Sequence, residues 1–286
     1  MSTSIVVTGA TGHLGRLIIE ALIARGLAPD HIVAAGRNPE RRAAVARLGV
    51  ATAVIDVANP ASLDSAFAGA DTLMLVSGSE VGQRTQQHAN AIASAARSGI
   101  TRIVYTSAPH ADTSALILAP EHKATEQALL DSGIPFSILR NNWYTENYLS
   151  SMTQASGSGT YADSTRGGRV ASASRIDFAD AAAVVLTTAG HENTTYELGG
   201  DHAWDGSELA DAMAEVLGKP VTYSTLTPKQ HAAALTATGL DPGTVGFLVA
   251  LDGNIHDGLL GETTGDLTRL IGRPTTPLSE GLRAGR

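Results

Sequence analysis

Three glycines near the N-terminus have the type and spacing of a phosphate-binding turn. Gly9, Gly12 and Gly15 follow an apolar run at residues 5–7 and lead into a helical pattern of apolar residues. At such a junction the first glycine permits a tight turn, the second lets backbone approach a pyrophosphate, and the third lets helix and strand pack closely. Free N–H groups and the dipole at the helix start attract phosphate. The sequence therefore predicts a dinucleotide site, with an ordinary turn of another α/β fold as the alternative. The residues predicted to contact the dinucleotide here are Gly9, Thr11, Gly12, His13 and Leu14.

The residue after the second predicted strand indicates which dinucleotide binds. An NAD-binding Rossmann unit usually has a carboxylate there, which bonds the ribose 2′-hydroxyl. In this chain the strand at 31–35 is followed by Gly36 and Arg37. A guanidinium suits the 2′-phosphate of NADP through charge-assisted hydrogen bonds. We therefore predict NADP(H) as the cofactor, bound by Arg37 with help from Arg41 and Arg42; the alternative is that all three form a solvated helix start.

The predicted strand at 72–76 is followed by a second group of candidate cofactor residues. Ser77, Gly78 and Ser79 are small, so the backbone here can lie along the cofactor. Arg84 opens the next predicted helix. We expect Arg84 either to reach phosphate or substrate or to be a solvated surface residue.

Candidate catalytic residues follow the predicted strand at 102–106. The hydroxyl of Ser107 is expected to donate to a substrate carbonyl, and His122, Lys123 and Tyr144 are the nearby general-acid types. Neighbouring helix residues do not share a face, so at most one of His122 and Lys123 points into the site. For His122 the alternative is a polar residue on the flank of a helix.

A dense cluster of amide and aromatic side chains follows the predicted strand at 136–140. Asn141 and Asn142 are expected to bond the nicotinamide amide or ribose, and Trp143 and Tyr144 to wall a flat substrate pocket. The carboxyl end of a strand in an open α/β sheet is a common ligand position. The alternative is a loop that plugs the core with its aromatic rings.

Composition narrows the function further. The 286 residues are 43% hydrophobic and 17% charged, as in soluble globular proteins, and the net charge of −8 argues against a nucleic-acid partner. Without cysteine the chain has no disulfide, Cys-ligated zinc or thiolate nucleophile, and its nine histidines lack metal-ligand spacing. Neither a membrane span nor a signal peptide is indicated, so we expect a cytoplasmic protein with a small-molecule substrate, considered as a possible homodimer.

The elements that position these residues alternate between strand and helix in the first half of the chain. This alternation predicts an α/β fold with a Rossmann-type, doubly wound parallel sheet. Residues 1–150 are expected to form an NADP-binding Rossmann domain. Residues 151–286 are expected to form a smaller substrate-binding lobe, interleaved with the last sheet elements. Within the lobe, residues 154–168 are rich in Gly, Ser and Thr and are predicted to form a loop.

In combination, the motifs resemble those of the NmrA-like atypical short-chain dehydrogenases, and within them the bacterial NADPH:quinone oxidoreductases and triphenylmethane reductases. The motifs that carry the resemblance lie at residues 8–15, 35–39, 79–84, 105–107, 140–147 and 270–274. The resemblance implies a Rossmann fold, NADPH and hydride delivery to a flat conjugated acceptor. It also implies that the site works mainly by positioning donor and acceptor, because the Tyr-x-x-x-Lys pair of standard short-chain dehydrogenases is missing.

Two residues depart from the pattern of these relatives. His122 falls where isoflavone-reductase-like relatives carry a lysine, and Lys123 comes one place later. Asn142 replaces the glycine expected in the quinone-reductase motif, and we expect its side chain to narrow the pocket.

The function expected from the sequence is an NADPH-dependent reductase of a quinone or an activated carbonyl. Ser107 and Tyr144 would contact the carbonyl, with His122 or Lys123 as proton source. The alternatives are a ketone reductase with a different pocket and a non-catalytic, NADP-sensing regulator, which is the role of the family's name-giving member. An epimerase-like or dehydratase role is disfavoured by the missing Tyr/Lys pair.

Overall fold

The structure is a computed structural model that describes residues 4–78, 80 and 82–285. Ser79 and Val81, which belong to motifs discussed above, lie outside the described residues. Spatial contacts divide the chain into two compact units. The first unit is Met1–Asp112, Pro120–Asn141 and Arg175–Glu197, and the second is Thr113–Ala119, Asn142–Ser174 and Leu198–Arg286. The boundary predicted at residue 150 does not coincide with this division, because the chain enters the second unit at Asn142 and returns to the first for residues 175–197.

A seven-stranded sheet forms the centre of the first unit, in the order β3-β2-β1-β4-β5-β6-β8. The pairs formed among strands β1 to β6 are all parallel. Every residue of β4 is buried, as expected for a parallel strand covered on both faces. The strands are β1 Ile5–Val7, β2 Ile32–Gly36, β3 Ala51–Val54, β4 Thr72–Leu75, β5 Arg102–Ser107, β6 Phe136–Asn141 and β8 Thr194–Leu198.

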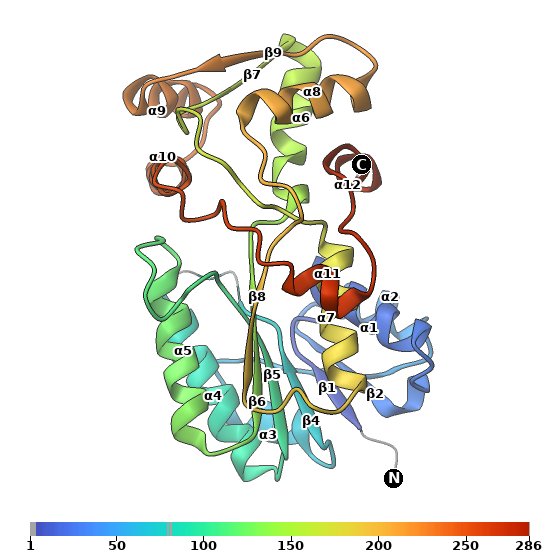
Figure 1. Ribbon diagram of the computed structural model, residues 1–286. Helices are drawn as coiled ribbons and strands as arrows, with labels where there is room; N and C mark the ends of the chain where they lie inside the picture. The colour runs from blue at the N-terminus through green and yellow to red at the C-terminus, as the bar shows by residue number, and fades with distance from the viewer. Residues whose placement is uncertain (1–3, 79, 81, 286) are drawn as a thin grey trace. The chain divides into compact units, whose positions relative to one another are not determined.

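Helices cover both faces of this sheet (Figure 1). Helices α1 (His13–Ala24), α2 (Pro39–Ala46) and α7 (Arg175–Thr187) lie on one face, and α3 (Pro60–Phe67), α4 (Arg84–Arg97) and α5 (Ala119–Ser132) on the other. A short 3-10 helix, η1 (Pro29–His31), precedes β2. This arrangement is the doubly wound Rossmann-type sheet that the sequence predicted, and it brings the carboxyl ends of the strands to one edge.

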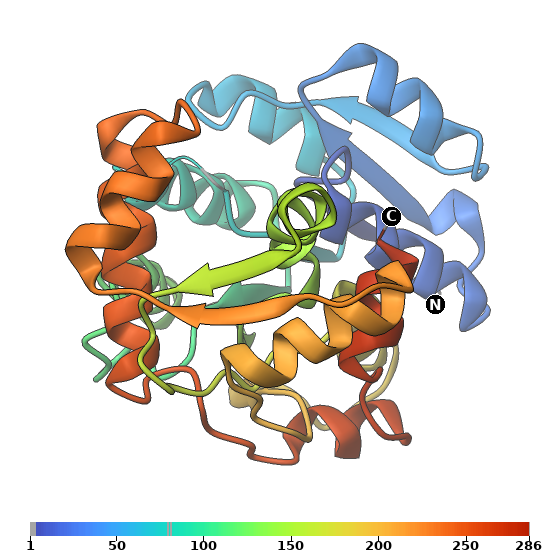
Figure 2. The same ribbon diagram turned by 90° about the horizontal axis from the view of Figure 1, so that it is seen from above.

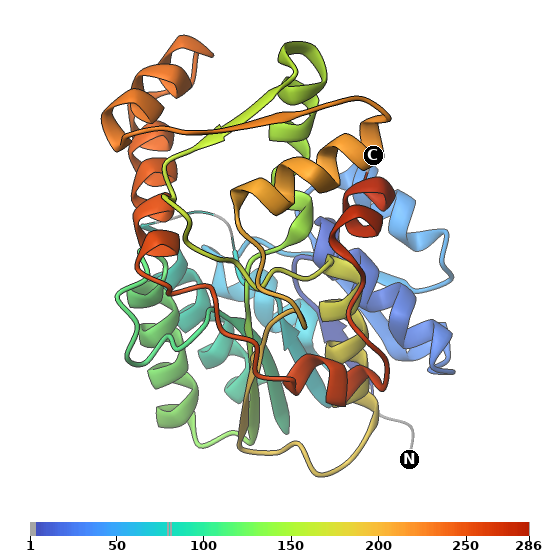
Figure 3. The same ribbon diagram turned by 45° about the horizontal axis from the view of Figure 1, so that its top comes forward.

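The second unit is built around a two-stranded parallel ribbon of β7 (Thr160–Asp163) and β9 (Thr222–Thr225) (Figure 2). Helices α8 and α12 pack against each other, as do α9 and α10 (Figure 3). The helices of this unit are η2 Thr145–Tyr148, α6 Leu149–Ser158, α8 Gly206–Leu217, α9 Pro228–Ala237, α10 Pro242–His256, α11 Asp266–Ile271 and α12 Leu278–Ala284.

The loop predicted at 154–168 is wrong over its first ten residues. Helix α6 continues to Ser158 and buries Met152 and Ala155, and β7 follows after Gly159, whose φ of 71° ends the helix. The polar composition misled the prediction, because β7 is stabilised by pairing with β9, some sixty residues later in the chain. No helix among the described residues is both long and apolar enough to cross a bilayer.

Candidate functional site

The glycine turn has the geometry that its sequence predicted. Gly9 has a φ of +62°, a left-handed conformation that favours glycine, and the Gly12 N–H donates to the Gly9 carbonyl at 2.8 Å. A Cβ at Gly15 would lie 2.3 Å from the Gly9 carbonyl oxygen, so only glycine lets α1 approach the turn this closely. Gly12 occupies the N-cap of α1 and has no side chain to fill the space above the helix start. The N–H groups of a first helical turn have no intrahelical acceptor, so this cradle fits the pyrophosphate of a dinucleotide.

The other predicted residues of the turn lie around this cradle. His13 is the exposed first residue of α1, and Leu14 is buried beneath it. Thr11 lies against the end of β2, because a Cβ at Gly36 would come within 2.4 Å of the Thr11 methyl carbon. Gly36 therefore lets the end of β2 lie beside the glycine turn and places Arg37 next to it.

Arg37 forms an ion pair with a residue that the sequence analysis did not single out. Its Nη2 lies 2.6 Å from Oε1 of Glu80, and Oε2 of Glu80 accepts a hydrogen bond of 2.8 Å from Nε2 of Gln87. These bonds from Gln87 and Arg37 lower the pKa of Glu80. The Arg37 side chain remains 65% exposed. The predicted helpers Arg41 and Arg42 lie in the first turn of α2, and their role stays a prediction.

Hydroxyl contacts join the ends of β4 and β5. The Ser77 N–H donates to Oγ1 of Thr106 at 2.9 Å, and that hydroxyl lies 3.3 Å from the Ser77 Oγ. The half-buried Ser77 thus sits at the carboxyl edge of the sheet, as predicted. Its contact with the cofactor stays a prediction.

Arg84 is neither solvated nor open to a ligand in the way expected. Its side chain is buried, Nε donates to the Gly78 carbonyl at 2.8 Å, and Nη1 pairs with Glu121 at 2.9 Å. The guanidinium therefore fixes the segment after β4 to the start of α5. A buried arginine needs such partners, and the sequence does not show that Glu121 supplies one.

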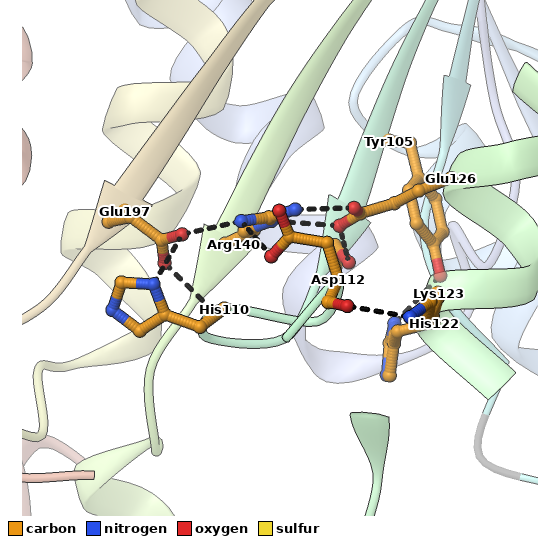
Figure 4. A network of polar contacts seen from close by, with 9 residues as sticks. Tyr105, His110, Asp112, His122, Lys123, Glu126, Arg140 and Glu197 are labelled. Carbon is orange, nitrogen blue, oxygen red and sulfur yellow. Dashed lines mark hydrogen bonds and ion pairs between the residues drawn. The ribbon is translucent and has the colours of Figure 1, made fainter. Parts of the chain in front are cut away.

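A polar cluster surrounds Arg140, the residue before the last of β6 (Figure 4). Glu126 on α5 binds it through two parallel hydrogen bonds, from Nε at 3.0 Å and from Nη2 at 2.6 Å. Its Nη1 lies 2.8 Å from Glu197 and 2.9 Å from Asp112. Burial alone would lower the pKa of Arg140, but hydrogen bonds to Glu126 and Glu197 outweigh it and raise that pKa. Arg140 and Glu126 thus form a buried ion pair beneath the edge of the sheet.

This cluster also includes Ser107, which was expected to donate to a substrate carbonyl. The buried Ser107 hydroxyl donates to Oε1 of Glu126 at 2.6 Å. A carboxylate is a stronger acceptor than a neutral carbonyl, so this hydrogen bond is favourable. Ser107 therefore positions Glu126 in this structure, and its role as donor to a substrate carbonyl stays a prediction.

His122 and Lys123 do not share a face, as predicted, and His122 does not match a proton donor, while the role of Lys123 stays a prediction. His122 is buried, and its Nδ1 hydrogen-bonds the hydroxyl of Tyr105 at 2.7 Å (Figure 4). Burial, with Arg84 and His88 nearby, lowers the pKa of His122 to about 3, so it is a neutral imidazole at neutral pH. Lys123 is exposed and its Nζ donates to the Asp112 carbonyl at 2.7 Å.

Tyr105 was missed as a polar residue of this site. It lies in the middle of an apolar strand, so its position predicted only a core residue. Its ring is fully buried, and burial raises its pKa, which keeps the hydroxyl protonated. The one sequence signal for it is the Tyr105-Thr106-Ser107 motif of the resemblance.

The side chain of Asn142, in the second unit, forms hydrogen bonds to the backbone of the protein itself. Its Nδ2 donates to the Leu260 carbonyl at 3.2 Å, and its Oδ1 accepts the Trp143 N–H at 2.6 Å. The buried carboxamide therefore holds two chain segments together, and its expected bond to the cofactor and its narrowing of the pocket stay predictions. Asn141, the buried last residue of β6, belongs to the first unit, and its contact with the cofactor stays a prediction.

The aromatic residues after Asn142 are fixed by backbone hydrogen bonds. Tyr144 pairs with Ala173 in a parallel bridge, and the Thr145 N–H donates to the Ala173 carbonyl at 3.0 Å. Trp143 and Tyr144 are both half-buried. Their role as walls of the acceptor pocket stays a prediction. Among residues 4–78, 80 and 82–285, no group of acidic or histidine side chains is arranged to hold a metal.

Comparisons with known proteins agree with this architecture. A family model described as NAD(P)H-binding matches residues 9–193. Quinone oxidoreductase 2 of Escherichia coli is 45% identical over 96% of each chain. The crystal structure of the Escherichia coli NADPH-dependent quinone oxidoreductase QOR2 with NADPH superposes with a TM-score of 0.93 at 44% identity, covering 98% of this chain and 99% of that one. The Citrobacter triphenylmethane reductase complexed with NADP(H) gives 0.92 at 35% identity, covering 99% and 100%.

These relatives confirm the predicted fold and the resemblance drawn from the motifs. The matched region begins at Gly9 and ends at Asn193, so it includes the glycine turn, Arg37 and strands β2 to β6. The chain belongs to the NAD(P)H-binding family, with quinone oxidoreductase 2 among its relatives.

Proposed function

We propose that the protein is an NADPH-dependent reductase that delivers hydride to a quinone. One observation carries this proposal: a cradle that only glycine permits, followed by Arg37 at the end of β2, in a chain that is 45% identical to a quinone oxidoreductase. When bound, the reduced nicotinamide supplies the hydride. Every other contribution comes from residues of this chain.

Two regions of the first unit would hold the coenzyme. Gly9, Gly12 and the first turn of α1 would bind the pyrophosphate through backbone N–H groups. Arg37 would bind the 2′-phosphate, which NAD lacks. Ser77 and Asn141, at the ends of β4 and β6, would contact the part of the coenzyme that crosses the carboxyl edge of the sheet.

The hydrogen bonds and the charge state of the candidate acids favour a quinone over a simple ketone as the substrate. Reduction of a ketone forms an alkoxide, which needs an acid nearby, whereas the reduced quinone is a far more stable anion. In the described part of the first unit, Ser107 donates to Glu126, His122 is neutral and Lys123 is bound to the Asp112 carbonyl. Tyr144 remains a candidate acid, and with Trp143 we assign it to acceptor binding in the second unit. We place the reaction in the cytoplasm.

The test is NADPH oxidation, followed by nicotinamide absorbance, with a panel of quinones and ketones and with NADH in parallel. We expect turnover of quinones with NADPH and little turnover of unactivated ketones. Faster turnover of prochiral ketones would favour the ketone reductase and restore a proton donor. Tight NADPH binding without turnover of any acceptor would favour the NADP-sensing regulator. Size-exclusion chromatography of the same preparation tests the homodimer.

A further inference from the structure

The ion pair of Arg37 spans the place where the glycine turn lies. Arg37 follows β2 and Glu80 follows β4, and these two strands flank β1 in the sheet. Their Nη2 to Oε1 distance is 2.6 Å. The glycine turn follows β1, so the pair bridges the two sides of the predicted coenzyme site.

A hydrogen bond from Gln87 orients the carboxylate of Glu80 toward Arg37. Gln87 is buried on α4 and donates its Nε2 hydrogen to the second carboxylate oxygen of Glu80 at 2.8 Å. With one oxygen bound to Gln87 and the other to Arg37, the carboxylate faces the guanidinium. The chain therefore supplies its own anion at the position where an external anion is expected.

We propose that Glu80 competes with the 2′-phosphate of NADP(H) for Arg37 and thereby limits the affinity for this coenzyme. The inference rests on the proposed function, which assigns the 2′-phosphate to Arg37. Carboxylate and phosphate bind a guanidinium through the same charge-assisted hydrogen bonds, so one replaces the other. The phosphate carries more charge and therefore displaces the carboxylate. Its net binding free energy is reduced by the free energy needed to separate Arg37 from Glu80. NAD(H) has an uncharged hydroxyl at this position, which does not compete for the guanidinium as an anion and leaves the pair intact.

The exposure of the pair makes this exchange feasible. The side chains of Arg37 and Glu80 are 65% and 33% exposed, so either group is solvated when the other leaves. Exposed ion pairs contribute about 0.2–1 kcal/mol, which corresponds to a change in binding of up to about five-fold. We therefore expect a modest effect that is specific to NADP(H).

The test is Glu80→Gln, which removes the charge and keeps the size of the side chain. Dissociation constants of NADPH and NADH are measured by calorimetric titration. We expect NADPH to bind about two- to five-fold more tightly and NADH to bind unchanged. An unchanged or weakened NADPH affinity, or an equal gain for both coenzymes, would overturn the proposal.

Asp64→Asn provides the matched control. Asp64 forms a similarly exposed pair with Arg97 at 2.7 Å, between α3 and α4, and its substitution is expected to change neither affinity. A gain in NADPH affinity with this variant equal to that of Glu80→Gln would show a general charge effect and would also overturn the proposal.

The variant Arg37→Ala separates this inference from the proposed function. If Arg37→Ala weakens NADPH and abolishes the gain from Glu80→Gln in the double variant, both ideas stand. If Arg37→Ala weakens NADPH but Glu80→Gln alone gives no gain, only the role of Glu80 fails. If Arg37→Ala leaves NADPH affinity unchanged, the assignment of the 2′-phosphate fails, and the inference fails with it.

Discussion

Arg37 and Arg140 each make an ion pair of 2.6 Å, yet the two regions around them do different things. The pair of Arg140 with Glu126 is buried, with side chains 10% and 7% exposed, and two further carboxylates and Ser107 are arranged around it. The Arg37 pair is partly exposed, with side chains 65% and 33% exposed, and has one further partner, Gln87. The bond length is therefore uninformative about role. Burial decides whether a partner can leave, and only the exposed arginine can exchange its carboxylate for a ligand.

The largest expected effect that separates the two regions is on stability. Arg140→Met should lower the free energy of unfolding by about 3–5 kcal/mol, because it leaves Glu126 buried without its cation. Arg37→Met should lower it by less than about 1 kcal/mol. Urea denaturation of the two variants measures both values. Equal losses would contradict the comparison, and Arg140→Lys, which keeps the charge but loses the two parallel bonds, should give an intermediate value.

The buried region also predicts a dependence of stability on pH. Burial lowers the pKa of His88 and of His122 from 6.5 to about 3, so the folded protein keeps both neutral. Below about pH 6.5 the unfolded chain binds protons that the folded chain does not, so stability falls as the pH drops from about 6.5 toward 3. Each histidine should cost on the order of 2 kcal/mol between pH 7 and pH 5.

Urea denaturation at these two pH values measures that loss. His122→Gln retains a group that can hydrogen-bond Tyr105 but does not titrate. It should therefore flatten the pH dependence. A slope equal to that of the wild type would show that His122 is not buried as a neutral imidazole.

A substitution in the exposed region around Arg37 is expected to change the affinity for the coenzyme. Arg37→Ala should weaken NADPH by about tenfold or more, because a hydrogen bond to a charged group contributes about 1.5–3 kcal/mol. NADH should be affected much less, since it has no 2′-phosphate. Calorimetric titration of both coenzymes measures the two changes. A matching loss for NADH would mean that Arg37 supports the turn in general.

The smallest effect is expected at Lys123. Lys123→Gln removes a hydrogen bond from an exposed Nζ to the Asp112 carbonyl, so kcat with a quinone should change by less than about two-fold. Steady-state turnover across the pH range measures it. A collapse of kcat, with loss of an alkaline limb in the pH profile, would identify Lys123 as the proton donor after all.

The parts of this molecule that could be predicted from sequence are those fixed by local patterns. The glycine turn and the strands on either side of it follow from backbone conformation and hydrophobic periodicity over a few residues. The ribbon of β7 and β9 could not be predicted in this way, because the partner strand lies far away in the sequence.

The same limit applies to the polar residues of the candidate site. Ser107 was expected to donate to a substrate carbonyl, and Arg84 either to reach phosphate or substrate or to be solvated, but residues of α5 bind both of them. Asn142 is engaged by the carbonyl of Leu260, more than a hundred residues later. Residue types alone do not show which polar groups remain available, because this is decided by partners that only the folded chain brings near.

The most direct test of the account is the ratio of kcat/KM for NADPH to that for NADH, measured with one quinone acceptor. In the wild type this ratio should strongly favour NADPH, and in Arg37→Ala it should fall by at least about tenfold through the NADPH value alone. A wild-type enzyme that uses both coenzymes equally, or a ratio that Arg37→Ala leaves unchanged, would contradict the claim that Arg37 beside the glycine turn selects NADPH.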